Sequence, residues 1–329
     1  MRAVVIAGLL TSACAAQRAE LPPPPLIPMP TSTATTLGPP PPPPHPADIV
    51  AVDAPVPAVR PAPPAPPPPP RVSTGMQWLY GSGEGAAASI QSYRAVRDYV
   101  FAATRRRPAT SVILADGATV AAPAFVPCGK KPLAVVLDVD ETVIQNLGYE
   151  YALARSGKES DGGALNRWQK EGRIEARAMP GAVDALNAIK AKGVAVIYNT
   201  NRDDEDAEAT AATIARAGLP PGVIKVSLFH RGDVDGQNSK DGRRTYIAQR
   251  YCVVAMVGDQ LGDFSEQFNR RGIGVQERRA LAAAGAIAAL WGKGWFLLSN
   301  PVYGPGLRGA IDEVFPPDVR WSDPGETKP

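Results

Sequence analysis

Three acidic side chains stand close together directly after a run of apolar residues. The segment AVVLDVDETV places Asp138, Asp140 and Glu141 at the end of what should be a buried strand. Carboxylates crowded at such a place repel one another and are costly to desolvate. A cation, or a reaction that uses the acids, is therefore needed to account for them.

Other polar groups follow the remaining apolar runs. Thr200 ends the run VAVIYNT, and Asp259 and Asp263 come at and after the end of the run CVVAMVGD. Lys240 opens a helical pattern between two such runs. Because chemistry collects at the carboxyl ends of parallel strands, we expect these stretches to meet at one rim. Facing carboxylates there favour a hard cation, and Thr200 and Lys240 add donors suited to phosphoryl oxygens.

The elements that must position these groups alternate in type along the chain. Apolar runs predict strands, and helical periodicity with proline starts or glycine stops predicts the helices between them. We expect strands at 133–138, 194–200, 223–229, 252–259 and 294–300. We expect helices around 90–100 and at 180–193, 205–218, 240–250 and 277–290. The alternation predicts an α/β fold with a doubly wound parallel sheet covered on both faces.

A polar, irregular stretch at 147–178 lies between the first two strands. It is unsuited to the sheet, so we expect a small helical cap or insert beside the site.

Four motifs occur in a fixed order: DVDET from Asp138, the threonine of YNTNR, Lys240, and GDQLGDF. In this order the chain resembles the haloacid dehalogenase (HAD) superfamily of phosphatases, which has a Rossmann-like fold. Within it the chain resembles the class C (subfamily IIIB) acid phosphatases, exported bacterial enzymes often anchored as lipoproteins. That resemblance runs from Gln77 to about Gly304 and includes QWLYGSGE, MPGAVDAL and NPVYG.

The chain departs from the family pattern beside the core motifs. The differing residues are Gln145, Leu147-Gly148, Asn199 and Gln260. They bear on substrate preference more than on the chemistry.

The resemblance implies a Mg²⁺-dependent hydrolysis of phosphomonoesters. Asp138 would attack phosphorus and form an aspartyl-phosphate, and Asp140 would protonate the leaving oxygen and then deprotonate water. Mg²⁺ would be held by Asp138, the backbone carbonyl of Asp140, and Asp259. Thr200 and Lys240 would hold the nonbridging oxygens.

Ordinary structural roles remain open for several of these residues. Thr200 suits a helix cap, and Lys240 suits a solvated position at a helix start. By the resemblance Asp263 orients Lys240 or the water shell of the metal, but it also suits the cap of a helix that begins near Phe264. His230 is more typical of a hydrogen-bonded loop residue than of a ligand, and we leave it outside the site.

Substrate recognition is expected to involve aromatic and polar side chains. The resemblance places Tyr149, Trp168 and Tyr303 near the leaving group, where flat rings stack on a nucleobase or another aromatic ring. Asn201 and Arg202 belong to the same expected substrate-binding set. Tyr149 and Trp168 also suit the core of the insert. We expect a preference for nucleoside 5′-monophosphates among broader phosphomonoesters.

The pH dependence of activity follows from the assigned acid. A partly buried Asp140 beside another carboxylate is expected to have a raised pKa. Activity should then peak on the acidic side of neutrality.

Two alternatives to an enzyme are open. Exported proteins with this fold can serve as non-catalytic storage or binding proteins, but such a relative would be expected to lose the nucleophile, and Asp138 is present. A proline-rich scaffold carrying a passenger domain is the other alternative.

The N-terminus MRAVVIAGLLTSACAAQ reads as a short secretory signal over 1–21. It resembles a bacterial lipoprotein signal in which Cys14 is lipidated, although Thr11 stands where leucine is usual. Cleavage near 15–16 is the alternative. We therefore expect a cell-envelope protein that is periplasmic and anchored to the outer membrane as a lipoprotein.

Proline blocks dominate the segment 22–74, which cannot bury a core and should sample extended polyproline II. We interpret it as a spacer between the anchor and a catalytic domain at 75–329; a PxxP ligand is the alternative. The net charge of +3 gives no indication of a nucleic-acid partner. The expected partners are a small phosphomonoester and, through the anchor, a membrane, and a homodimer is left open as an assembly.

Lipidation of Cys14 would leave Cys128 and Cys252 as an even pair in an oxidising compartment. Each precedes a strand, the first ending at Asp138 and the second at Asp259. If those strands are neighbours, both cysteines lie at the same edge of the sheet. We predict a disulfide between them, with two structural thiols as the alternative.

Overall fold

The computed structural model describes residues 70, 72–171, 176–236, 238–323 and 325. The expected signal over 1–21, Cys14 and nearly all of the spacer over 22–74 lie outside the described residues. Within the described part, no helix combines the length and the apolar character that crossing a membrane requires.

The centre of the fold is a five-stranded sheet in the order β7-β6-β3-β8-β9. All four neighbouring pairs are parallel, which confirms the expected doubly wound α/β fold. The strands are β3 (Leu133–Leu137), β6 (Ala195–Asp203), β7 (Leu228–Arg231), β8 (Cys252–Gly258) and β9 (Trp295–Leu297).

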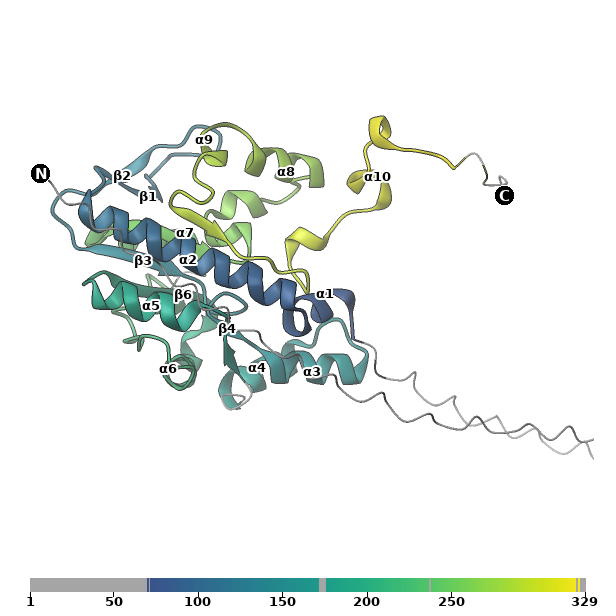
Figure 1. Ribbon diagram of the computed structural model, residues 1–329, viewed down its shortest axis with the longest axis horizontal. Helices are drawn as coiled ribbons and strands as arrows, with labels where there is room; N and C mark the ends of the chain where they lie inside the picture. Colours follow the sequence, from purple (N-terminus) through teal and green to yellow (C-terminus); the bar gives the residue numbers. More distant parts are fainter. Residues whose placement is uncertain (1–69, 71, 172–175, 237, 324, 326–329) are drawn as a thin grey trace, which may run out of the picture. The chain divides into compact units, whose positions relative to one another are not determined.

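Two layers cover the sheet because its central strand is apolar on both faces. Val135 and Leu137 of β3 pack into one core cluster with α2 (Gly83–Arg105) and α5 (Ala182–Ala191), which lie side by side (Figure 1). Ala134 and Val136 pack into the opposite cluster, which contains residues of α7 (Lys240–Arg250) and of the hairpin formed by β1 (Thr110–Leu114) and β2 (Phe125–Pro127). This even burial is what a parallel strand between two helical layers requires.

The remaining elements lie around this sandwich. Helices α6, α8, α9 and α10 span Ala207–Arg216, Val275–Ala283, Gly285–Ala288 and Ile311–Val314, and the hairpin strands β1 and β2 span Thr110–Leu114 and Phe125–Pro127. Short α1 (Thr74–Met76) and the π-helical turn Gln77–Gly81 lead into α2.

The expected insert is helical. It consists of α3 (Leu147–Ser156) and α4 (Gly162–Glu171), which pack together, and it is bounded by the short antiparallel pair of β4 (Ile144–Gln145) and β5 (Arg177–Ala178) (Figure 1). The insert leaves the core immediately after the acidic segment that follows β3, so it lies next to the candidate site.

Three element boundaries were predicted wrongly. The strand expected at 223–229 begins only at Leu228, because the Val223 carbonyl accepts backbone hydrogen bonds from Val226, Ser227 and Leu228 and closes a turn there. The helix expected at 277–290 is split between α8 and α9 at Gly285, which has a φ of 61°. The strand expected at 294–300 is reduced to Trp295–Leu297.

Cys128 and Cys252 are joined by a disulfide with a sequence separation of 124 residues. Both side chains are buried. The bond ties the segment that precedes β3 to the first residue of β8, the two central strands that carry acids at their ends.

We expect the double variant Cys128→Ala/Cys252→Ala to lose about 2–5 kcal/mol of unfolding free energy, because the bond closes a long loop in the unfolded chain. Urea unfolding, followed by circular dichroism with and without reductant, measures the loss. The variant should not respond to reductant. Equal midpoints for oxidised and reduced wild type would contradict the prediction.

Candidate active site

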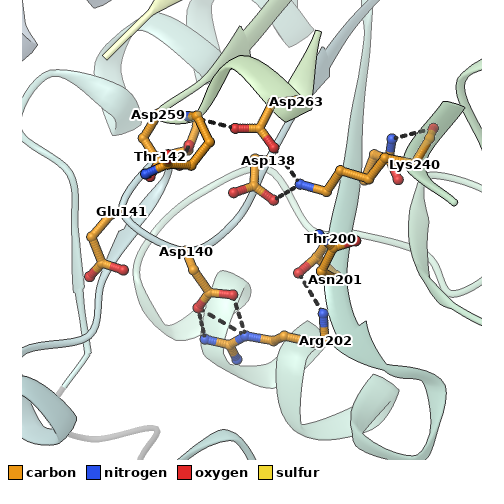
Figure 2. Close-up of polar contacts among 12 residues, drawn as sticks. Asp138, Asp140, Glu141, Thr142, Thr200, Asn201, Arg202, Lys240, Asp259 and Asp263 are labelled. Atoms are coloured by element: carbon orange, nitrogen blue, oxygen red, sulfur yellow. Dashed lines mark hydrogen bonds and ion pairs between the residues drawn. The ribbon is translucent and has the colours of Figure 1, made fainter. Parts of the chain in front are cut away.

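The sheet order brings the predicted polar groups to one rim. Strand β3 lies between β6 and β8 in the sheet. Asp138 directly follows β3, Thr200 lies in β6, and Asp259 directly follows β8. Lys240 is the first residue of α7, which packs on β6 and β8. All four groups therefore reach the same carboxyl edge from four different elements (Figure 2).

Lys240 lies between two carboxylates. Its Nζ is 2.5 Å from Asp138 Oδ1 and 2.7 Å from Asp263 Oδ1. Its backbone N–H donates to Glu266 Oε1 at 2.6 Å, and the Ser239 hydroxyl caps the same helix. The side chain is only 4% exposed, so the alternative of a solvated lysine is wrong.

Asp138, Asp259 and Asp263 form a compact acidic cluster. One carboxylate oxygen from each lies within 4.8 Å of the other two. Burial, followed by the charge of Asp263, raises the pKa of Asp259 to about 7. Burial also raises the pKa of Asp138 well above its usual value, although Lys240 opposes this rise. When ionised, these three carboxylates outnumber the one ammonium group, which contacts only Asp138 and Asp263.

This donor set fits a hard divalent cation. Carboxylate oxygens are ligands that hard divalent cations take, and the charge of such a cation would compensate the excess carboxylate. Asp259 is held in place by donors on both oxygens: Thr142 Oγ1 at 2.9 Å from Oδ1, and Asn300 Nδ2 at 2.8 Å from Oδ2. Such outer contacts orient a metal ligand.

Asp140 faces away from this cluster and toward Arg202. The guanidinium donates to both carboxylate oxygens, with Nη2 at 2.7 Å from Oδ1, and Asn146 Nδ2 donates to Oδ1 at 2.8 Å (Figure 2). Burial alone would raise the pKa of Asp140, but the Arg202 charge and these hydrogen bonds outweigh it and lower the pKa. The expected raised pKa of Asp140 is therefore wrong. The partner that reverses the shift lies 62 positions away in the sequence.

Glu141 is fully buried and accepts four hydrogen bonds. The donors are the hydroxyls of Tyr80 and Tyr303 and both nitrogens of Asn146. Burial, followed by the charge of Asp140, raises the pKa of Glu141 to about 7 despite the contacts with Asn146 and Tyr303. Glu141 thus connects the segment after β3 to the loop after β9, which contains Tyr303, and to the start of the insert.

The three aromatic residues expected to contact substrate lie in three different settings. Trp168 Nε1 donates to Asn146 Oδ1 at 2.8 Å, which links the insert to the Asp140 pair. Tyr303 is 38% exposed while its hydroxyl reaches Glu141. Tyr149 is buried within the insert, and its hydroxyl contacts the backbone of Asp161 instead.

Three of the alternatives are decided by position. Thr200 lies inside β6 and accepts from the Arg202 N–H, so it caps no helix. Asp263 both contacts Lys240 and accepts from the Gln260 N–H at 2.9 Å in a short 3-10 turn. His230 lies in β7, buried, with its Nδ1 at 3.2 Å from Asp233.

Sequence reasoning missed several supporting residues. Asn146, Arg243, Glu266, Thr142 and Asn300 all contact groups of the site. Thr142 and Asn300 stood inside the quoted segments DVDET and NPVYG, so the signal for them was present. Local signals were also present for Asn146, which stands five and six positions after Glu141 and Asp140, and for Arg243, which follows Lys240 in a Lys-then-Arg spacing. Glu266 carried no local signal, because its partner Lys240 lies 26 positions away.

Comparisons with known proteins agree with this geometry. A family model described as HAD superfamily, subfamily IIIB (acid phosphatase), matches residues 86–306. Two solved structures of the class C acid phosphatase from Bacillus anthracis, one of them a crystal structure with tungstate bound, are similar to the chain at 25% and 26% identity. Each match has a TM-score of 0.57 and covers 70% of this chain and 84% of the other.

Proposed function

Because the chain belongs to the acid phosphatase family of HAD subfamily IIIB and is therefore a phosphomonoesterase, we propose that it works through an aspartyl-phosphate on Asp138. We further propose Mg²⁺ as its cofactor and nucleoside 5′-monophosphates as its preferred substrates. Phosphatases of this superfamily usually use a divalent metal, and an acidic cluster suited to one is present.

The observation that carries the proposal is the placement of Asp138. Lys240 binds its Oδ1, and within the described part of the chain nothing is hydrogen-bonded to Oδ2. The lysine fixes the carboxylate and leaves Oδ2 to attack phosphorus in line. A bond forms between Oδ2 and phosphorus while the bond from phosphorus to the leaving oxygen breaks.

Asp140 supplies the proton in this scheme. It gives its proton to the departing oxygen, and it then takes a proton from the water that attacks the aspartyl-phosphate, which releases phosphate and restores Asp138. Arg202 favours the ionised form of Asp140, so the protonated form grows as the pH falls. We therefore still expect activity to peak at acidic pH, but for a different reason: the pKa of Asp140 is low, and the reaction needs Asp140 protonated.

Asp138 and Asp259 would hold the metal, with Asp263 near enough to bind it directly or through water. When bound, the cation offsets the repulsion between an anionic nucleophile and an anionic phosphate. Thr200, Asn201 and Lys240 would donate to the nonbridging oxygens.

We expect Arg202→Gln to move the descending limb of the kcat/KM–pH profile toward higher pH. The sign follows because removing the guanidinium raises the pKa of Asp140, and the reaction needs Asp140 protonated. The shift is measured by comparing kcat/KM–pH profiles of wild type and variant with one substrate. The comparison uses the pH at which kcat/KM falls, so a lower maximal kcat/KM in the variant does not affect it. An unmoved limb would exclude Asp140 as the group that titrates.

The nucleotide preference is supported by the half-exposed Tyr303 ring and by Trp168 at the edge of the insert. Stacking on one ring contributes about 1–3 kcal/mol, so kcat/KM for a nucleoside monophosphate should exceed that for glycerol phosphate by about tenfold or more. Tyr149 is a weaker candidate because it is buried against Asp161.

Phosphate release from a panel of monoesters, with and without EDTA, tests the proposal. We expect EDTA to abolish the activity and added Mg²⁺ to restore it. Full activity in EDTA would exclude the cofactor, and equal kcat/KM for glycerol phosphate and nucleotides would exclude the preference.

We also propose that Cys14 is lipidated and that the segment 22–74 spaces the enzyme from the outer membrane on its periplasmic side. The support is the sequence pattern alone. Membrane fractionation of wild type and Cys14→Ser, with intact-mass analysis for the lipid, tests it; a soluble, unlipidated wild type would contradict it. A homodimer remains a prediction.

A further inference from the structure

Arg243 is a fully buried cation whose partners are all neutral. It lies one turn after Lys240 on α7 and is 0% exposed. Its Nε donates to Asn199 Oδ1 at 2.6 Å, its Nη2 to Asn201 Oδ1 at 2.8 Å and its Nη1 to the Asn238 carbonyl at 3.3 Å. Among the described residues, no carboxylate lies within ion-pair distance of it, although an unpaired buried charge is normally costly.

A guanidinium can only donate hydrogen bonds. An asparagine that contacts it must therefore turn its Oδ1 toward it and its Nδ2 away. For Asn199 the outward amide reaches the Lys240 carbonyl at 3.5 Å, which connects strand β6 to the start of α7. The family departure at Asn199 thus provides one acceptor for this arginine.

For Asn201 the amide nitrogen is likewise turned away from the buried guanidinium, because Oδ1 accepts from Arg243 Nη2. Asn201 is exposed, and it stands between Thr200 and Arg202 at the rim where Lys240 meets Asp138 (Figure 2). Within the described residues its Nδ2 has no hydrogen-bond partner. Arg243 therefore orients Asn201 so that its Nδ2 is left without a partner at the rim where phosphoryl oxygens would bind.

We propose that Arg243 is a positioning residue that fixes the Asn201 amide so that Nδ2 donates to a phosphoryl oxygen, while its buried charge increases the attraction for phosphate. The inference rests on the proposed function, because it needs phosphate at this rim. The phosphate supplies the negative charge that the arginine lacks in the protein itself.

Burial, followed by the neighbouring Arg244, lowers the pKa of Arg243 to about 10, so the side chain still carries its charge at neutral pH. Methionine at this position would remove both the charge and the two contacts that orient the asparagines. The exposed Arg250 at the end of the same helix has, among the described residues, polar and ring contacts with Tyr246 alone, which makes it a matched control.

Asn201→Asp separates positioning from a merely structural role. A carboxylate keeps, and strengthens, the contact with Arg243, so a structural role predicts an equal or higher melting temperature. Positioning predicts, in addition, weaker phosphate binding, because residue 201 loses its amide donor and gains an oxygen that repels phosphate.

Calorimetric titration of inorganic phosphate into the full chain with Mg²⁺ tests the inference without relying on turnover. We expect Asn201→Asp and Arg243→Met each to weaken phosphate binding about tenfold or more, and Arg250→Met to leave it unchanged. Adding Asn201→Ala to Arg243→Met should cost little further, because both act on one amide.

Unchanged phosphate affinity in Asn201→Asp would overturn the inference, and this measurement does not depend on whether Arg243→Met folds. Fully additive losses of phosphate affinity in the Arg243→Met/Asn201→Ala double variant would also overturn it. A wild type that binds phosphate but hydrolyses no monoester would instead overturn the proposed function.

Discussion

Asp138→Asn should lower kcat for every phosphomonoester by at least about 10⁴-fold, because it removes the atom that attacks phosphorus. An amide can still accept from Lys240, so the surrounding contacts should persist. The melting temperature should be unchanged or higher, since a neutral side chain relieves charge in a buried acidic cluster. Phosphate release and thermal unfolding on the same preparation measure both effects.

The control is Asp184→Asn, an exposed acid in the first turn of α5. It removes the same charge from a side chain that forms no hydrogen bond or ion pair within the described residues, and it should keep wild-type kcat. An Asp138→Asn enzyme with a few per cent of wild-type activity would argue for water as the direct nucleophile and against an aspartyl-phosphate.

Asp140→Asn should have an effect that depends on the leaving group. Alkyl phosphates need a proton on the departing oxygen, so their hydrolysis should slow by about 10²–10⁴-fold. An aryl phosphate with an acidic phenol leaves without that proton, so its first step should be nearly unaffected. The second step still needs a base, and the aspartyl-phosphate should accumulate.

Rapid mixing with p-nitrophenyl phosphate measures this directly. We expect a burst of nitrophenol close to one equivalent of enzyme, followed by slow turnover, and a phosphate adduct on the peptide that contains Asp138. An equal loss for alkyl and aryl substrates without a burst would assign Asp140 to binding instead of proton transfer. Arg202→Gln serves as the comparison, because it alters the pKa of Asp140 but leaves the carboxyl in place.

Much of the fold could be predicted from the sequence because its signals are local. Apolar runs with helical segments between them define strands and helices, and the parallel-strand rule places Asp138, Thr200 and Asp259 at one rim. The order of the four motifs indicated the phosphatase family to which the chain belongs. The errors concern ends of elements, such as the late start of β7, where one carbonyl at Val223 decides between turn and strand.

What the sequence determined by itself is the identity and order of the chemical groups, since residue types and strand ends are local properties. What only the tertiary structure decided is the charge state and direction of those groups. Asp140 is paired with Arg202, Glu141 is enclosed by Tyr80 and Tyr303, and Asn201 is turned by an arginine from another element. Electrostatic and hydrogen-bond energies depend on distance in space, and residues that are far apart in sequence set those distances only when the chain is folded.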